Sequence, residues 1–286
     1  MALLLVPAAL LLSLVFVAPL IRYAWLSGHA SSVLTGLTPV PNHGANWIRL
    51  VADQRFWQDL GQTLRFTGVS VTLELILALA IALLLDQRWR GRGVVRATVL
   101  IPWALPTTVM ALGWRWIFNT PYGPLNQIAN LFGQADLNIL ANPSITWMAT
   151  VVGDLWKTTP FAALILLAGL QTIPADLYEA LRLEGAEPTT CFRRITLPLL
   201  TPYIGLALLF RLAQAFGVFD LIQVMTGGGP ASSTESLALY AYLNAMRFLD
   251  FGYSATIMIG SFLLLLILCA SLWWILRVAQ QPVERI

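Results

Sequence analysis

The sequence predicts an all-α integral membrane protein with six transmembrane helices. Of its 286 residues, 58% are hydrophobic and only 11% are charged, and the mean hydropathy is +0.73. A typical soluble domain has about 25% charged residues, so a soluble globule of this composition could not cover its surface. The hydrophobic residues also gather in six runs, each near the roughly 20 residues that a spanning helix needs. The net charge of +3 is too small for a nucleic-acid-binding protein.

The six runs account for most of the chain. In order they are Ala2–Ile21, Phe66–Leu85, Ala97–Phe118, Ile145–Leu170, Leu197–Met225 and Ala255–Leu276. They do not show the two-residue alternation over about 10 residues that marks transmembrane β-strands. The first run has no basic segment before it and is too long for a signal peptide, so we expect it to span the membrane. We expect one transmembrane domain over residues 1–286.

The distribution of arginine predicts that both termini are cytoplasmic, because short cytoplasmic loops carry an excess of basic residues. The loop at 119–144 has no cation, and the loop at 226–254 has only Arg247. The loop at 22–60 is less clear, with three arginines offset by two aspartates. The arginines assigned to the cytoplasmic side are Arg88, Arg90, Arg92, Arg96, Arg182, Arg193, Arg194, Arg277 and Arg285.

Several kinds of chemistry are not expected in this chain. Cys191 falls in a cytoplasmic loop and Cys269 in the last run, so we predict no disulfide. The only lysine, Lys157, does not follow a Gly-rich turn, which excludes a P-loop for ATP. His29 and His43 are interpreted as ordinary loop residues rather than metal ligands. Any uphill transport would draw its energy from a partner or an ion gradient.

The segment at 171–196 is predicted to form a helix–turn–helix outside the membrane. Pro174 suits the first turn of a helix, and Gly185 suits the position just after its end. Pro188 then starts a second short helix, which we expect Pro198 to end.

The first of these two helices has an apolar stripe formed by Leu177, Tyr178 and Leu181. Nothing else in the chain is obviously available to cover the stripe. Such a face is typical of a docking site for another protein. The alternative is an amphipathic helix that rests on lipid headgroups, and these residues alone leave both interpretations open.

The same segment resembles the "EAA" loop of ABC importer permeases. It reads Glu-Ala-Leu-Arg-Leu-Glu-Gly-Ala from Glu179 to Ala186 and is followed by Leu197-Pro198. Two positions depart mildly from the family pattern: Leu181 replaces the second Ala, and Glu184 replaces the usual Asp.

Further motifs match in the family's order and spacing, over roughly residues 55–275. They are Arg90–Gly93, Pro102–Pro106, Trp114–Trp116, Tyr122–Asn126 and Thr226–Pro230, then Thr234, Tyr240, Tyr242 and Gly252. The chain as a whole is therefore similar to the binding-protein-dependent sugar permeases of the maltose, trehalose and glycerol-phosphate type.

This resemblance implies a type I ABC importer permease fold in a bacterial plasma (inner) membrane. It implies a heterodimer with a second homologous permease, two cytoplasmic ATPase subunits that bind ATP and Mg, and an extracytoplasmic solute-binding protein. The chain itself would then need neither a cofactor nor a catalytic residue. The helix at 175–184 would enter a cleft of one ATPase through Leu177, Tyr178, Glu179, Ala180, Leu181, Gly185 and Ala186.

Polar residues inside the fourth and fifth runs form the candidate solute path. Asp154, Lys157, Thr158 and Phe161 share one face of the fourth helix, and Arg211, Gln214 and Val218 share one face of the fifth. Ionisable groups in a membrane core are functional candidates because their burial is costly. The structural alternative is an ion pair between Asp154 and Lys157, with or without Arg211. The full predicted set is Asp154, Trp156, Lys157, Thr158, Phe161, Arg211, Gln214, Phe216 and Val218.

Two other functions remain open at this point. In an ion-coupled secondary transporter, Asp154 and Lys157 would be the ion site, although the cytoplasmic helix–turn–helix argues against it. A membrane-embedded enzyme would need a carboxylate or histidine cluster that the sequence does not offer. For a permease, the solute could be a disaccharide such as trehalose or maltose, a glucosylated polyol or glycerol phosphate, and we favour a neutral sugar.

Overall fold

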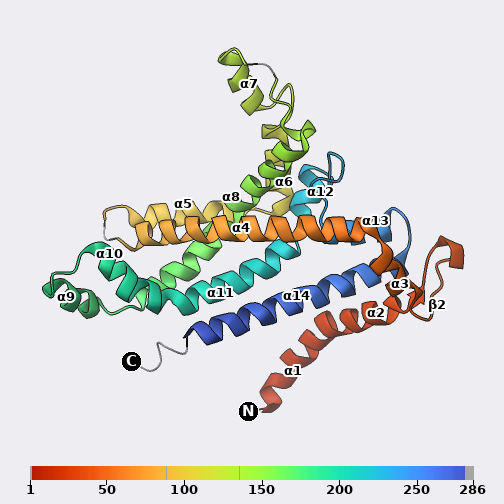
Figure 1. Ribbon diagram of the computed structural model, residues 1–286, viewed down its shortest axis with the longest axis horizontal. Helices are drawn as coiled ribbons and strands as arrows, with labels where there is room; N and C mark the ends of the chain where they lie inside the picture. Colours follow the sequence, from red (N-terminus) through yellow and green to blue (C-terminus); the bar gives the residue numbers. More distant parts are fainter. Residues whose placement is uncertain (1, 88, 135, 281–286) are drawn as a thin grey trace. The chain divides into compact units, whose positions relative to one another are not determined.

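The computed structural model describes residues 2–87, 89–134 and 136–280. Arg88 and Arg285, which contributed to the predicted orientation, lie outside these ranges. The predicted helical membrane fold is confirmed (Figure 1): the described residues contain five helices long and apolar enough to span a membrane, or six if one sharply bent pair is a single span. The chain forms two compact units, residues 1–63 with 235–266 and residues 64–234 with 267–286.

The first unit contains the N-terminal helix and the loop that follows it. Its elements are α1 (Ala2–Leu12), the π-helical η1 (Ser13–Val17), α2 (Ala18–Ser27), β1 (His29–Ala30), η2 (Val33–Thr35), β2 (Val40–Pro41), α3 (Ala45–Ala52), the start of α4 (Gln54–Asp86), α13 (Leu237–Met246) and the start of α14 (Phe251–Gln280). The two short strands pair antiparallel, His29 with Pro41 and Ala30 with Val40.

The second unit holds the remaining helices, including most of α4 and the end of α14. Its other elements are α5 (Arg92–Ala104), α6 (Thr107–Ile117), α7 (Pro124–Leu131), η3 (Ile139–Ala141), α8 (Pro143–Gln171), α9 (Ala175–Leu183), α10 (Pro188–Cys191), the π-helical η4 (Phe192–Thr196), α11 (Leu197–Phe216) and α12 (Asp220–Met225). Cys191 and Cys269 are both free thiols.

Small side chains let α4, α8 and α11 pack closely in the second unit. Ala78, Ala162 and Ala207 are completely buried where the three helices meet. At Gly169, a β-carbon would lie only 2.5 Å from the ring of Tyr203. Small residues at such contacts are the usual means of close packing between helices in lipid, where burial of apolar surface provides little driving force.

The third predicted span, Ala97–Phe118, is wrong as a single helix. It consists of α5 and α6, which are bent by 90° at Leu105 and Pro106. Both residues adopt extended backbone angles. Proline has no N–H to donate and disfavours helical angles in the residue before it, so this pair favours a break in the helix.

The fifth predicted span and the second loop helix also need correction. Leu197–Met225 is interrupted after Phe216, and α12 is a separate short helix. The short helix that begins at Pro188 is not ended by Pro198, because α10, η4 and α11 form one continuous 29-residue segment.

A π-helical turn explains how the chain passes Pro198 without breaking. A proline ring in a regular α-helix clashes with the carbonyl four residues earlier. Here η4 ends at Thr196, two residues before Pro198, and η1 ends at Val17, two residues before Pro19. Each π-helical turn changes the hydrogen-bonding pattern just where the ring would clash.

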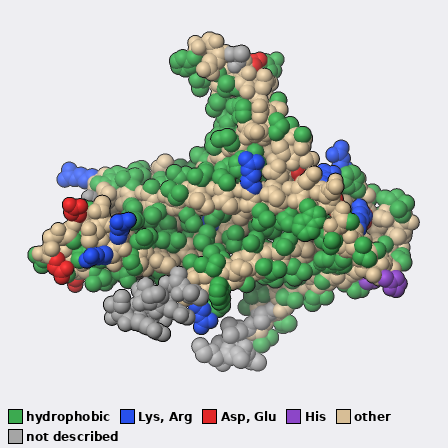
Figure 2. Space-filling model, viewed as in Figure 1, with side chains coloured by type: hydrophobic (Ala, Val, Ile, Leu, Met, Phe, Trp, Pro, Cys, Tyr) green, Lys and Arg blue, Asp and Glu red, His purple; other side chains and the backbone are tan. Residues whose placement is uncertain are grey.

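Charged side chains are sparse along the spanning helices. Figure 2 shows hydrophobic side chains over most of the visible surface of α4 and α11, with red and blue groups at the α9–α10 end and further blue groups at the opposite end and over α4. This distribution fits helices whose sides contact lipid and whose connecting loops contact water.

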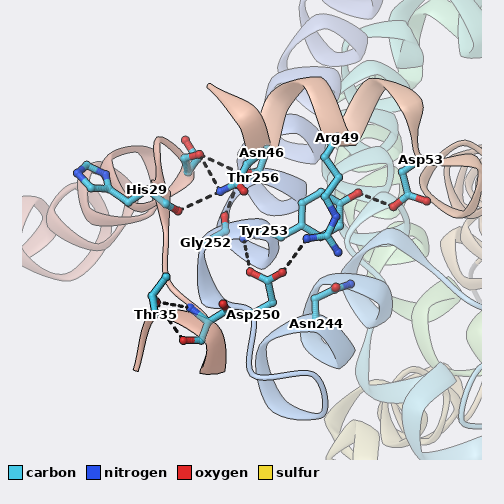
Figure 3. A network of polar contacts seen from close by, with 12 residues as sticks. His29, Thr35, Asn46, Arg49, Asp53, Asn244, Asp250, Gly252, Tyr253 and Thr256 are labelled. Carbon is cyan, nitrogen blue, oxygen red and sulfur yellow. Dashed lines mark hydrogen bonds and ion pairs between the residues drawn. The ribbon is translucent and has the colours of Figure 1, made fainter. Parts of the chain in front are cut away.

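A polar network holds the loop of the first unit together and against the start of α14 (Figure 3). Asn46 Nδ2 donates to the carbonyls of Ser27 and His29, at 3.3 and 3.0 Å. Arg49 Nη1 contacts Asp250 at 2.7 Å, and its guanidinium lies 3.7 Å from the centre of the Tyr253 ring. The side chains of Asn46 and Arg49 thus anchor the loop, although it has little regular secondary structure.

Gly252 is required where this loop meets α14. A β-carbon at this position would lie 2.2 Å from the carbonyl oxygen of His29 and 3.0 Å from the amide nitrogen of Ser31. Only glycine permits this approach of the two backbones. The glycine matched by sequence resemblance therefore has a packing role.

Asp53 forms a second polar centre in the same unit. Tyr240 Oη donates to Asp53 at 2.6 Å, and Tyr253 donates to the same carboxylate. Partial burial raises the pKa of Asp53, but the hydrogen bonds from the two tyrosines and from the Arg55 backbone lower it below its ordinary value. Burial and the neighbouring carboxylate raise the pKa of Tyr240 to about 12, which keeps its hydroxyl protonated as a donor.

Candidate functional site

A polar cavity of about 290 Å³ lies in the second unit. Its walls come from α5, α6, α8, α11 and α12. The lining residues are Trp103, Thr107, Met110, Asp154, Lys157, Thr158, Arg211, Gln214, Gly217, Val218, Phe219, Asp220 and Leu221. The four charged residues among them are two acidic and two basic, so their formal charges cancel.

The structure brings six of the nine predicted path residues to this cavity: Asp154, Lys157, Thr158, Arg211, Gln214 and Val218. The other three do not line it. Trp156 packs edge-on against Trp114, with ring centres 5.9 Å apart. Phe161 stacks on Trp103 at 5.4 Å, and Phe216 is buried among apolar groups. Helical spacing indicated which polar residues share a face, but it could not tell which aromatic rings face the cavity.

Arg211 is the centre of a buried charge network. Its side chain is 2% exposed and forms ion pairs with Glu74 and with Asp154, the latter at 3.0 Å. It also donates to Gln214 Oε1 at 2.8 Å, and Ser70 donates to Asp154. Charges buried this deeply are tolerated only when they pair with opposite charges, as Arg211 does here with both carboxylates, although Glu74 Oε1 has no hydrogen-bond partner.

The structural alternative with an ion pair between Asp154 and Lys157 is only half right. Asp154 pairs with Arg211, whereas no ion pair in the described ranges includes Lys157. Lys157 Nζ instead donates to the carbonyls of Leu105 and Trp103. These carbonyls lie at the break between α5 and α6, a feature that the sequence analysis did not anticipate.

Glu74 is the residue that sequence reasoning missed. Its side chain is fully buried in α4 and supplies the second carboxylate for Arg211. The signal was present, because Glu74 is the only charged residue in the run Phe66–Leu85, and an ionisable group within such a run is a functional candidate.

The predicted coupling loop has the expected first helix. α9 ends in a Schellman motif: Gly185, with φ +80°, donates its amide to Arg182 O at 2.9 Å, and Ala186 donates to Leu181 O at 3.2 Å. No atom lies within 4 Å of a β-carbon placed on Gly185. Glycine is therefore favoured here by backbone conformation and not by crowding.

The apolar stripe of α9 is only partly free. Leu177 is 43% exposed, and Glu179 and Ala180 are also exposed. Tyr178 and Leu181 are half-buried, and Tyr178 Oη lies 2.9 Å from Thr196 Oγ1 at the end of η4. Tyr178 thus attaches α9 to its own chain, whereas Leu177, Glu179 and Ala180 remain exposed.

Comparison with known proteins decides the family. Residues 74–279 match the model of the "binding-protein-dependent transport system inner membrane component" family. The chain belongs to this family. It is accordingly an ABC importer permease of the inner membrane, a translocation subunit rather than an enzyme.

Curated permeases align with this permease over most of their length. It is 42% identical over 265 residues to the trehalose/maltose transport system permease protein MalF of Thermococcus litoralis, covering 92% of this chain and 89% of the relative. It is 39% identical to the sulfoquinovosyl glycerol transport system permease protein SmoG of Agrobacterium fabrum, with coverage of 92% and 85%. It is 35% identical to the trehalose transport system permease protein SugA of Mycobacterium tuberculosis, with coverage of 88% and 80%.

Solved structures agree on the permease fold. A bacterial ABC transporter involved in the import of the acidic polysaccharide alginate has a chain that matches with a TM-score of 0.84 at 18% identity, covering 96% of this permease and 94% of that chain. The MetNI methionine ABC transporter matches with a TM-score of 0.55 at 23% identity, with coverage of 80% and 95%. These likenesses concern the fold alone.

Metal binding is not indicated in the part of the permease that the structure describes. No three His, Cys, Asp or Glu side chains come together there in a ligand-like group. The two carboxylates near Arg211 are ion-paired to it.

Proposed function

We propose that the permease carries a neutral sugar, such as trehalose, maltose or a glucosylated polyol, through the polar cavity of its second unit. The observation that carries the proposal is the cavity itself, with hydrogen-bonding groups and balanced charge inside membrane-spanning helices. Sugar hydroxyls need both donors and acceptors, which Gln214, Thr158 and Asp154 offer. Two relatives, 42% and 35% identical, are named as permeases for trehalose/maltose and for trehalose.

The same proposal includes the partners. The permease pairs with a second homologous permease, receives its solute from an extracytoplasmic binding protein, and is driven by two cytoplasmic ATPase subunits that bind ATP and Mg. Both termini and the α9 loop are cytoplasmic. ATP-driven closure of the ATPases moves the two permeases as rigid bodies and alternates access to the cavity.

Sugar uptake by the reconstituted importer tests the solute path. Gln214→Ala removes an amide from the cavity wall and should lower uptake without loss of the complex. Leu206→Ala, on an exposed part of the same helix, is the matched control. Competition should favour a disaccharide over glycerol phosphate. Full uptake in Gln214→Ala, or stronger competition by glycerol phosphate, would contradict the neutral-sugar path.

Co-purification of the ATPase tests the coupling role of α9. Glu179→Lys reverses an exposed charge of this helix, and Gly185→Val places a β-branched side chain at φ +80°. Both should reduce ATPase recovery and uptake, whereas Gly185→Asn should be tolerated better because asparagine adopts left-handed angles more readily. Glu187→Lys, outside α9, is the charge control. Undiminished recovery and transport in both test variants would exclude α9 as the attachment point.

Thiol labelling tests the orientation. A cysteine at the exposed Ser232 should react with an impermeant reagent added outside, and one at the exposed Thr189 only after the membrane is opened. The opposite pattern would reverse the topology and place α9 outside.

A further inference from the structure

The break between α5 and α6 leaves backbone carbonyls without helical partners. Pro106 has no N–H, and the extended angles at Leu105 carry the chain out of the helix. In a membrane protein, a break at this depth is tolerated only where other groups satisfy the freed carbonyls or where it lines a cavity. Here both conditions hold, because Trp103 and Thr107, on either side of the break, line the polar cavity.

Lys157 supplies the donors for this break. From α8, its ammonium donates to Leu105 O and, at 3.5 Å, to Trp103 O. A cation at the C-terminal end of a helix also interacts favourably with the helix dipole. Its side chain lines the same cavity, so one group contacts both the break and the proposed solute path.

A second contact from the same face of α8 strengthens this attachment. One turn beyond Lys157, Phe161 stacks on the Trp103 ring with an angle of 12° between the planes. Beyond the break, α6 packs against α12, and Arg115 Nη1 donates to Val224 O at 3.3 Å. The α5 arm is therefore held by α8, whereas the α6 arm is held by α12 and, through Trp114 and Trp156, also by α8. Lys157 lies at the joint between the two arms.

We propose that Lys157 is a positioning residue that fixes the bend between α5 and α6 and thereby the wall of the solute cavity. This inference rests on the proposed function, since it says which residue fixes the shape of the proposed solute cavity. Lys157 acts through the carbonyls of the break. Its removal should loosen the angle between the arms, and with it the placement of Thr107 and Met110 at the cavity wall.

Two variants separate the ammonium from the bulk of the side chain. Lys157→Met removes the donors and keeps an unbranched apolar chain, whereas Lys157→Arg keeps a charged donor. Nitroxide labels at the exposed Val94 and Leu112 report one arm each, in the full importer with Cys191 and Cys269 replaced. The interlabel distance distribution should be narrow in the parent and in Lys157→Arg, and broad in Lys157→Met.

Transport kinetics provide the second measurement. We expect the half-saturating sugar concentration of Lys157→Met to rise about tenfold, near the effect of losing one charged hydrogen bond, with a smaller change in maximal rate. Lys157→Arg should recover most of the loss. Arg277→Met, at the exposed end of α14, is the control for loss of a cation and should change neither measurement.

The outcomes distinguish the inference from the proposed function. An unchanged distance distribution in Lys157→Met would overturn the positioning role, whatever happens to uptake. A broadened distribution with unchanged sugar kinetics would support the role at the bend and contradict the solute path. If the importer with Lys157→Met fails to assemble, Lys157→Gln replaces it, because glutamine retains an amide donor. We expect this variant to broaden the distance distribution partially. A distribution as narrow as that of the parent would overturn the inference.

Discussion

The two units of the chain use arginine–carboxylate pairs under opposite conditions. In the first unit, Arg49 and Arg55 have side chains 54% and 40% exposed, so water still solvates both cations. In the second unit, Arg211 is 2% exposed, and its partners Glu74 and Asp154 are 0% and 9% exposed. The contacts are chemically alike, and in the first unit one carboxylate, Glu235, is also only 3% exposed. The difference is that the cations of the first unit keep contact with water, whereas in the second unit the cation and both carboxylates are buried. Ion pairs of the same chemical kind should therefore make very different contributions to the free energy of unfolding.

The largest effect should follow removal of Arg211. Arg211→Met leaves two buried carboxylates without their cation, and breaking a buried ion pair costs about 3–5 kcal/mol. We expect a large drop in the thermal unfolding midpoint and in the yield of folded permease. Glu74→Gln should cost less, because Asp154 still pairs with Arg211. A midpoint for Arg211→Met close to the parent value would show that the buried network is not what holds α4, α8 and α11 together.

The next effect tests the anchored loop of the first unit. Gly252→Ala forces a β-carbon against the His29 carbonyl, and such overpacking costs about 1–3 kcal/mol. Gly61→Ala is the matched control in the same unit, because no atom lies within 4 Å of its added β-carbon. In α4 this control should be neutral or stabilising by up to about 1 kcal/mol. Equal midpoints for the two variants would remove the close approach as an explanation for Gly252.

A smaller effect is expected for the exposed pair. Arg49→Met should cost about 1 kcal/mol or less, since exposed ion pairs and exposed cation–π contacts each contribute little. The difference from the parent should shrink as salt is added, because salt screens exposed charges more than buried ones. A loss as large as that of Arg211→Met, or one independent of salt, would erase the contrast between the units.

The smallest effect is expected in the dependence of stability on acidic pH. The pKa of Asp53 is lowered in the folded chain, so its contribution is fully present above the unfolded value of 3.8 and is lost as pH falls through the folded pKa. Asp53→Asn should therefore flatten the fall in stability below pH 3.8 that the parent shows. Parallel stability curves for the two proteins over this range would mean that Asp53 has no part in the acid response.

The sequence predicted the spanning helices because hydrophobic run length is a strong signal that does not depend on tertiary contacts. It placed Asp154, Lys157, Arg211 and Gln214 toward one interior site for a similar reason, since helical spacing fixes which residues share a face. The ends of the spanning helices were harder to predict from the sequence. α4 begins at Gln54, twelve residues before the predicted Phe66, because polar side chains in its first turns end the hydrophobic run without ending the helix. One of them, Thr63, accepts a hydrogen bond from the Leu237 amide.

The partners of charged groups could not be predicted. Asp154 and Lys157 share one helix face, which favoured an ion pair between them. In the structure, Lys157 instead donates to a carbonyl at the helix break, and Asp154 pairs with Arg211. Which carboxylate meets which cation depends on how α4, α8 and α11 pack, and one sequence does not encode that packing in its periodicity. The break itself was foreseeable from Leu105-Pro106, but the apolar run continued past it and concealed the bend.

The π-helical turn at Phe192–Thr196 has a consequence for how this chain tolerates insertions and deletions. A π-turn holds one more residue than the α-turn it replaces, and each residue of an α-helix corresponds to a rotation of about 100°. The extra residue is contained in one turn, so deleting one residue between Phe192 and Thr196 would return the segment to regular α-geometry and leave α10 facing nearly as before relative to α11. A deletion in the regular part of α11 would instead rotate the parts on either side of it by about that angle. The turn is therefore the place where this segment can lose one residue without redirecting α9, and the penalty would be a clash between the ring of Pro198 and the carbonyl four residues earlier.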